Sequence, residues 1–209
     1  MRVKRLAILL SGRGSNFEAI ASNIRSGRLD AEIAVVVSNR PDARGLETAR
    51  ELGITAVSLP SKGVSREEYD TLLADEVERH TADLVCLAGF MRLLSPHFVR
   101  RFPLRILNIH PSLLPSFPGL DAQHQAVEHG VKVSGCTVHF VDEYLDAGPI
   151  VGQAAVPVLD GDDADTLSAR ILAEEHRIYS EAIRLILGGE WSIEGRRVVA
   201  GRSTGLDSA

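Results

Sequence analysis

The 209-residue sequence contains few cysteines, few aromatic residues and no long apolar segment. Its two cysteines, Cys86 and Cys136, lie in apolar runs where a reduced buried thiol is the ordinary state, so we expect no disulfide framework and predict a cytoplasmic protein. No segment approaches the roughly 20 apolar residues of a membrane span. The first apolar run, residues 6–10, is too short for a secretory signal. We therefore expect no association with a membrane.

An excess of basic residues is also absent. The chain has 23 Lys and Arg against 28 Asp and Glu, which gives a formal net charge of −5. Such a balance disfavours nucleic acid as the main partner. With 44% hydrophobic residues the chain can bury a full core. We expect one domain over residues 1–190, followed over residues 191–209 by a small hairpin and a disordered polar tail.

Apolar strand patterns alternate with helical patterns along most of the chain. Residues 6–10, 33–37 and 82–88 are compact apolar runs, typical of parallel strands that are covered on both faces. They predict an α/β fold with a Rossmann-like, mostly parallel twisted sheet and helices on both faces. Residues 133–141 and 150–158 predict two further strands, joined by an acidic turn and added antiparallel near the C-terminal end.

The segment Leu107-Asn108-Ile109-His110-Pro111 combines a strand with two polar side chains. Residues two apart on a strand point to the same side, so Asn108 and His110 face one space and could both donate hydrogen bonds to a carbonyl oxygen. Pro111 ends the ladder, which puts His110 at the carboxyl end of its strand, where open α/β sheets bind ligands. The alternative, a polar strand end before a surface loop, is equally compatible with the sequence.

A glycine turn, Ser11-Gly12-Arg13-Gly14-Ser15-Asn16, connects the first strand to a helical pattern. Free N–H groups in such a turn and at the helix start can hold a phosphate. The turn lacks the third glycine of a dinucleotide fingerprint, and the second strand ends in Ser38 instead of an acidic residue. A monophosphate therefore fits better than NAD, although a simple tight connection is an alternative.

Other candidate residues are weaker when taken alone. Glu175 falls on the apolar stripe of a long predicted helix, so it needs a partner unless it lies at the edge of the stripe. Arg92 lies in an apolar loop that could hold a flat ligand or fill the core. Asp146 lies in an acidic turn, which is more often a solvated loop than a site. The seven histidines show no metal-ligand spacing, so no metal site is predicted.

Taken together, four motifs resemble the glycinamide ribonucleotide formyltransferase family, the folate-dependent formyltransferases of purine synthesis. They are Ser11-Gly12-Arg13-Gly14-Ser15-Asn16, Ala88-Gly89-Phe90-Met91-Arg92, Asn108-Ile109-His110-Pro111-Ser112-Leu113-Leu114-Pro115 and Leu145-Asp146-Ala147-Gly148-Pro149. The resemblance implies transfer of the formyl group of 10-formyltetrahydrofolate to the amine of glycinamide ribonucleotide, without a metal. One departure is Asp121-Ala122-Gln123, where the family more often has His-Thr-His.

Carried over position by position, the resemblance assigns roles to individual residues. It implies that the catalytic residues are Asn108, His110 and Asp146. It implies that the ribonucleotide is bound by Gly14, Ser15, Asn16 and Glu175. The folate site would be lined by Arg66, Met91, Arg92, Leu93, Leu94, Asn108, Asp142, Glu143 and Leu145. The small-molecule partners would be glycinamide ribonucleotide and a reduced folate, with the protein a monomer or a homodimer.

Three alternatives differ in reaction or in class. A formyltetrahydrofolate hydrolase would use the same Asn, His and Asp, but those enzymes carry an extra amino-terminal domain, which we do not expect before a first strand at residue 6. A methionyl-tRNA formyltransferase would carry a carboxyl-terminal tRNA-binding domain. A non-catalytic sensor of a phosphorylated nucleotide would need the glycine turn but not Asn108, His110 and Asp146.

Overall fold

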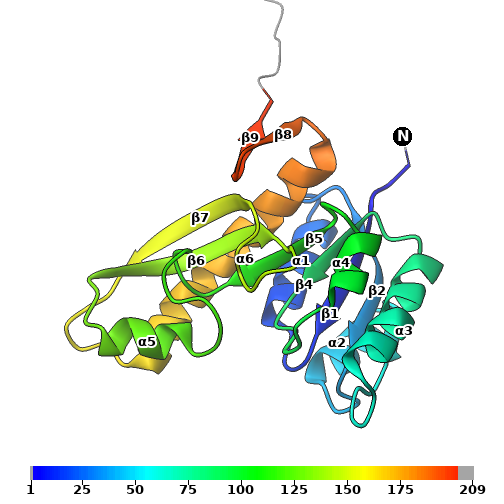
Figure 1. Cartoon of the computed structure of the whole chain (residues 1–209), viewed down its shortest axis with the longest axis horizontal. Coiled ribbons are helices and arrows are strands. Elements are labelled where there is room, and N and C mark those ends of the chain that lie inside the picture. The colour runs from blue at the N-terminus through cyan, green and yellow to red at the C-terminus, as the bar shows by residue number, and fades with distance from the viewer. Residues whose placement is uncertain (1, 202–209) are drawn as a thin grey trace, which may run out of the picture.

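The computed structural model describes residues 2–201, which form one mixed sheet surrounded by helices (Figure 1). The strands are β1 (Arg5–Leu10), β2 (Glu32–Ser38), β3 (Ala56–Ser58), β4 (Leu84–Leu87), β5 (Ile106–His110), β6 (Val133–Phe140), β7 (Ile150–Pro157), β8 (Trp191–Glu194) and β9 (Arg197–Ala200). The helices are α1 (Ser15–Arg25), α2 (Arg44–Glu51), α3 (Arg66–Arg79), α4 (Pro96–Arg101), α5 (Ala122–Glu128) and α6 (Ala164–Gly188).

The strands lie in the order β3-β2-β1-β4-β5-β6-β7-β9-β8. Neighbours from β3 to β5 pair in parallel, whereas β6 pairs antiparallel with both β5 and β7. In Figure 1, β6 and β7 extend away from the parallel strands, and α6 runs alongside them. The predicted α/β fold, with its antiparallel addition near the C-terminal end, is confirmed.

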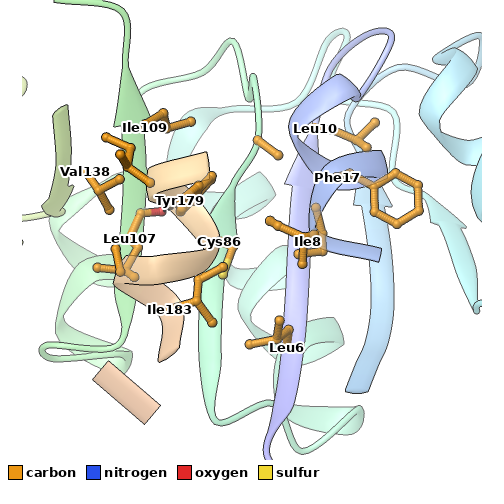
Figure 2. Packing of buried hydrophobic residues seen from close by; sticks show 14 of the residues in the cluster. Leu6, Ile8, Leu10, Phe17, Cys86, Leu107, Ile109, Val138, Tyr179 and Ile183 are labelled. Carbon is orange, nitrogen blue, oxygen red and sulfur yellow. Dashed lines mark hydrogen bonds between the residues drawn. The ribbon is translucent and has the colours of Figure 1, made fainter. Parts of the chain in front are cut away.

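Both faces of the parallel strands are buried, as their apolar runs predict. In β1, Leu6, Ile8 and Leu10 belong to a core with α1, α2, α5 and α6, while Ala7 and Leu9 belong to a second core with α3 and α4. Figure 2 shows part of the first core, where Phe17 of α1 and Ile183 of α6 approach the sheet. Each fully buried aliphatic side chain contributes about 1.5 to 3 kcal/mol.

Serine side chains cap the starts of two helices. Ser65 precedes α3 and accepts a hydrogen bond from the Glu68 N–H at 3.3 Å. Ser95 precedes α4, which begins with Pro96, and accepts from the Phe98 N–H. These side chains satisfy N–H groups that lack partners within the helix.

The C-terminal hairpin joins the sheet instead of standing apart from it. β8 and β9 pair antiparallel, and β9 meets β7 in parallel at Ile150 and Arg197. Trp191 stacks near Phe140, with ring centroids 5.2 Å apart. The tail predicted to be disordered falls mostly on residues 202–209, outside the described residues. Among residues 2–201, no helix combines the length and the apolar character that a membrane crossing requires.

Candidate active site

The order of the strands creates a switch point between β1 and β4. After β1 the chain builds β2 and β3 on one side, and then crosses back to build β4 and β5 on the other. Ligands of open α/β sheets bind beyond the carboxyl ends of the strands at such a point. A cavity of about 310 Å³ lies here, lined by Ser11, Gly12, Arg13, Gly14, Ser15, Asn16, Arg40, Ala88, Gly89, Met91, Leu172 and Glu175.

The glycine turn at this cavity has a backbone that only glycine adopts easily. Gly14 has a φ of 80° and is the N-cap of α1. A Cβ at Gly14 would lie 3.1 Å from the Leu10 side chain and 3.3 Å from the Gly45 backbone. No side chain caps α1 within the described chain, so its first N–H groups are open to an anion.

Asn16 of α1 and Glu175 of α6 meet at the wall of the cavity. Asn16 Nδ2 donates to Glu175 Oε2 at 2.8 Å, and both side chains are buried. Burial raises the pKa of Glu175 above its ordinary value, and the N–H donated by Asn16 only partly offsets this. Asn16 Oδ1 is buried without a hydrogen-bond partner among the described residues. The partner that Glu175 requires is thus Asn16, and the pair retains capacity for a ligand.

Two arginines add positive charge to the same cavity. Arg13 and Arg40 both line it and are exposed. Within residues 2–201, neither guanidinium group forms an ion pair with an acidic side chain. Arginine suits phosphate recognition because its donors match the oxygen geometry. The cavity therefore has the donors and the charge to hold a phosphate.

A second polar cluster lies where β5 ends. Leu107 and Ile109 belong to the core beside α1 and α6, so Asn108 and His110 project from the opposite face of the sheet. Tyr179 of α6 donates to the carbonyl oxygens of Leu87 and Leu107 at 3.0 Å each, which ties β4 to β5 (Figure 2). The predicted common direction of Asn108 and His110 agrees with the structure.

His139 and Asp146 complete this cluster. Asn108 Nδ2 lies 3.2 Å from His139 Nε2, which lies 3.6 Å from Asp146 Oδ1. Asp146 Oδ2 lies 3.5 Å from His110 Nδ1. Asp146 thus lies between two imidazoles, and the structure brings together all three residues of the predicted catalytic set.

Hydrogen bonds to backbone carbonyls determine where two protons lie. His110 Nε2 donates to the Phe117 carbonyl at 2.8 Å, and His139 Nδ1 donates to the Phe140 carbonyl at 2.8 Å. A carbonyl oxygen can only accept, so both nitrogens are protonated. Nε2 of His139 faces both the Asn108 amide and the Asp146 carboxylate, and the second N–H of Asn108 is left for another acceptor.

Asp146 is held charged by its surroundings. Burial alone would raise its pKa, but a hydrogen bond with His139, the Gly119 N–H and the nearby His110 together hold the pKa of Asp146 below its ordinary 3.8. The turn that carries Asp146 passes close to β6, where a Cβ at Gly148 would lie 1.9 Å from the Phe140 carbonyl oxygen. Glycine is required there for this close approach.

Most of the residues implied for the folate site lie on two loops, the first of which follows β4. Arg66, the first residue of α3, donates from Nε to the Leu93 carbonyl at 2.9 Å and also reaches the Leu94 carbonyl, so it braces this loop. The Arg92 guanidinium lies over the Tyr69 ring, 4.4 Å from its centroid. Met91 is 65% exposed and also lines the cavity at the switch point, which connects the two halves of the site.

The second loop is the turn between β6 and β7. Asp142 Oδ1 accepts from the Tyr144 N–H at 2.9 Å, and Glu143 forms an ion pair with Arg100 of α4 at 2.8 Å. Both carboxylates are therefore engaged within the protein. Tyr144 and Leu145 are exposed by 76% and 53%, so their side chains are accessible to a ligand at this turn.

Two contributions were missed by sequence reasoning. His139 alternates with the buried apolar residues Val138 and Phe140 and is itself 2% exposed, so its only signal was a polar residue in an apolar strand. Arg40 follows β2 and reaches the cavity only because β2 lies beside β1. Among residues 2–201, no group of three or more His, Cys, Asp or Glu side chains could hold a metal ion.

Known proteins resemble this chain in both sequence and fold. The formyl transferase family model matches residues 4–183. Phosphoribosylglycinamide formyltransferase of Escherichia coli is 43% identical over 203 residues, covering 97% of this chain and 93% of that protein. The crystal structure of glycinamide ribonucleotide transformylase 1 from Symbiobacterium toebii superimposes with a TM-score of 0.93 at 55% identity, covering 95% of this chain and 94% of that one.

A third relative is much longer than this chain. The trifunctional purine biosynthetic protein adenosine-3 of Drosophila melanogaster is 47% identical over 191 residues, which cover 90% of this chain but only 14% of that protein. Similarity at these levels, over almost all of the sequence and all of the fold, goes beyond shared topology. The chain therefore belongs to the formyl transferase family.

Proposed function

We propose that this protein transfers the formyl group of 10-formyltetrahydrofolate to the primary amine of glycinamide ribonucleotide, a step of purine synthesis. The proposal rests mainly on the position of two sites, which lie together at the carboxyl ends of the parallel strands. One is a cationic glycine turn suited to a phosphomonoester, and the other is the cluster of Asn108, His110, His139 and Asp146 suited to a reacting carbonyl.

The ribonucleotide phosphate would bind at the start of α1. The N–H groups of Ser15 and Asn16 and the Arg13 and Arg40 side chains supply donors and charge, while Gly14 permits close approach of the backbone. Glu175 and the unpartnered Oδ1 of Asn16 are acceptors for ribose hydroxyls or the amine. The apolar side chains of Met91, Leu93 and Leu145 offer a surface for the pterin of the folate.

The reaction needs one carbonyl to be polarised and one proton to be moved. The amine nitrogen attacks the formyl carbon and forms a tetrahedral intermediate with an oxyanion. The free N–H of Asn108 and an N–H of His110 would stabilise this oxyanion, at about 3 kcal/mol per donor. A proton then passes from the amine to N10 of the folate, assisted by Asp146, and the bond between the formyl carbon and N10 breaks.

His110 can serve as a donor only after a change in its contacts. Its Nε2 proton is bound to the Phe117 carbonyl, and its Nδ1 faces Asp146. One of these contacts must open, or be shared, before His110 can reach an oxyanion. The Phe117 contact is the better candidate, because releasing Asp146 would separate the imidazole from the carboxylate proposed to move the proton.

One assay tests the proposal. Purified protein is mixed with 10-formyltetrahydrofolate, and formation of tetrahydrofolate is followed with and without glycinamide ribonucleotide. We expect turnover only with the ribonucleotide, and one formylated ribonucleotide for each folate consumed. Turnover in water alone would instead identify a hydrolase. No turnover under either condition, combined with binding of the ribonucleotide, would identify a sensor.

A further inference from the structure

The C-terminal hairpin, β8 and β9, contacts the turn that carries Asp146. This hairpin lies beyond residue 183, where the match to the family model ends. It lies at the carboxyl end of α6 (Figure 1), where Trp191 Nε1 donates to the Ile186 carbonyl at 2.9 Å. Its turn brings Arg196 to the backbone of Ala147, and the Arg196 guanidinium donates to the Ala147 carbonyl.

The turn between β6 and β7 needs such support because its backbone is strained. Asp146 is a non-glycine residue with a φ of 48°. Such a conformation costs on the order of 1 kcal/mol or more and persists only where neighbouring groups hold it. The Gly119 N–H holds the Asp146 carboxylate at 2.8 Å, and Phe140 N–H holds the end of the turn through the Pro149 carbonyl at 2.9 Å. The hydrogen bond from Arg196 to the Ala147 carbonyl lies between these two contacts in the sequence of the turn.

We propose that Arg196 is a positioning residue, and that the hairpin is a clamp that keeps the Asp146 carboxylate between His110 and His139. The inference rests on the proposed function, since it assigns Arg196 to the catalytic turn. Arg196 touches neither the cavity nor the polar cluster. Its effect on the reaction therefore passes through Ala147 and Asp146.

A hydrogen bond from an exposed arginine usually contributes little, because ordering a long side chain costs entropy. Two features make this one different. The next residue, Arg197, pairs with Ile150 at the end of the same turn, so the backbone that carries Arg196 is already fixed. The Trp191 ring packs against Phe140, whose carbonyl holds His139 and whose N–H holds Pro149. The hairpin thus contacts both ends of the turn.

Three variants distinguish a positioning role of Arg196 from a general effect of its charge and from an effect on folding. Arg196→Ala removes the donor, and Arg196→Lys keeps a charged donor. Arg197→Ala removes the same charge from the neighbouring position, whose side chain forms no hydrogen bond with any of residues 2–201. We expect Arg196→Ala to lower kcat about tenfold, as small misplacements of reacting groups do. The KM for the ribonucleotide should stay within about twofold, because the phosphate turn is untouched. Arg196→Lys should recover most of kcat, and Arg197→Ala should resemble wild type.

A double-mutant cycle tests whether the effect passes through Asp146. In an Asp146→Asn background, Arg196→Ala should have little further effect on kcat. An equal loss of kcat in both backgrounds would overturn the inference, because Arg196 would then act on another group. An unchanged kcat in Arg196→Ala would overturn it as well.

A second readout does not depend on activity. The Asp146 carboxyl carbon can be titrated by NMR in the full chain, and in wild type its pKa should lie below the ordinary 3.8. Arg196→Ala should move this pKa towards 3.8, whereas Arg196→Lys and Arg197→Ala should leave it low. If wild type transfers no formyl group, the proposed function fails, yet this titration still decides whether Arg196 positions Asp146. An Asp146 titration unaffected by Arg196→Ala contradicts the clamp.

Discussion

Asn108 and His139 lie directly opposite each other in the antiparallel pairing of β5 and β6, and their side chains meet with Nδ2 and Nε2 3.2 Å apart. The imidazole is oriented by the Phe140 carbonyl on its other nitrogen and lies beside Asp146. A histidine in this position orients both the amide and the carboxylate on which the proposed chemistry depends.

Replacing His139 should therefore lower the rate more than the affinity. We expect His139→Ala to reduce kcat by about 10- to 100-fold, the usual effect of losing a group that orients a catalytic one. Both KM values should change by less than about threefold. Steady-state kinetics on protein shown to be folded by circular dichroism measures this. A folded variant with near-normal kcat would show that Asn108 and Asp146 are positioned without His139.

Asp146→Asn should lower kcat by about 10²- to 10⁴-fold, because the amide cannot carry the proton. Substrate binding should change much less. Kinetic analysis should be repeated with both substrates saturating. If kcat is retained, the proposed catalytic set reduces to Asn108 and His110.

The loss of stability caused by Asp146→Asn should depend on pH. The pKa of Asp146 is lower in the folded protein, so its interactions stabilise the fold above the ordinary value of 3.8 and are lost as the pH falls through the folded value. Asp146→Asn should thus be less stable than wild type at pH 7, and the difference should shrink below about pH 4. Urea unfolding at both pH values tests this, and a difference that is independent of pH would exclude the electrostatic account.

Asn16→Ala should raise the KM for the ribonucleotide by about 10- to 100-fold while leaving the folate KM near its original value, because the Asn16 side chain is assigned to the ribonucleotide alone and also holds Glu175. Arg13→Ala should act in the same direction, by about three- to tenfold. Arg44→Ala, which removes a nearby charge outside the cavity, is the matched control. Equal weakening of both substrates would contradict the assignment of this cavity to the ribonucleotide.

Glu175→Gln should stabilise the fold at neutral pH and weaken binding of the ribonucleotide. Burial raises the pKa of Glu175, so the folded state loses stability as the pH rises above the ordinary 4.5 and the buried side chain ionises. Glutamine avoids this cost and can still accept from Asn16. The variant should have a higher Tm than wild type at pH 7 but not at pH 4, with about 2 to 4 °C for each kcal/mol. The KM for the ribonucleotide should rise about 5- to 10-fold. A lower Tm at pH 7 would refute this view of Glu175.

Gly148→Ala should be strongly destabilising, because its Cβ would overlap the Phe140 carbonyl oxygen. We expect a loss of more than about 2 kcal/mol in the free energy of unfolding, together with a fall in kcat as the Asp146 turn shifts. Gly152→Ala in β7 is the control, since its Cβ would meet nothing within 4 Å. Similar stability of the two variants would mean that the turn can move away from β6 at little cost.

Local sequence patterns determined the buried strands, two helix starts and the common direction of two site residues. Continuous apolar runs specify strands buried on both faces, and Ser65 and Ser95 mark helix starts through their side-chain caps. The period of two placed Asn108 and His110 on one face, and the break at Pro111 placed them at a strand end. All of these signals act between residues close in the sequence, where backbone geometry alone relates the side chains.

Only the tertiary structure decided which distant residues meet. The register of β5 against β6 brings His139 to Asn108, and a one-residue slip would have turned it to the other face. The turn that folds back from β6 carries Asp146 to His110, although its local sequence is that of a solvated loop. The pairing of α1 with α6 joins Asn16 to Glu175, 159 residues apart. Such contacts depend on strand order and on loop paths, which are set by the packing of the whole chain and leave no local pattern.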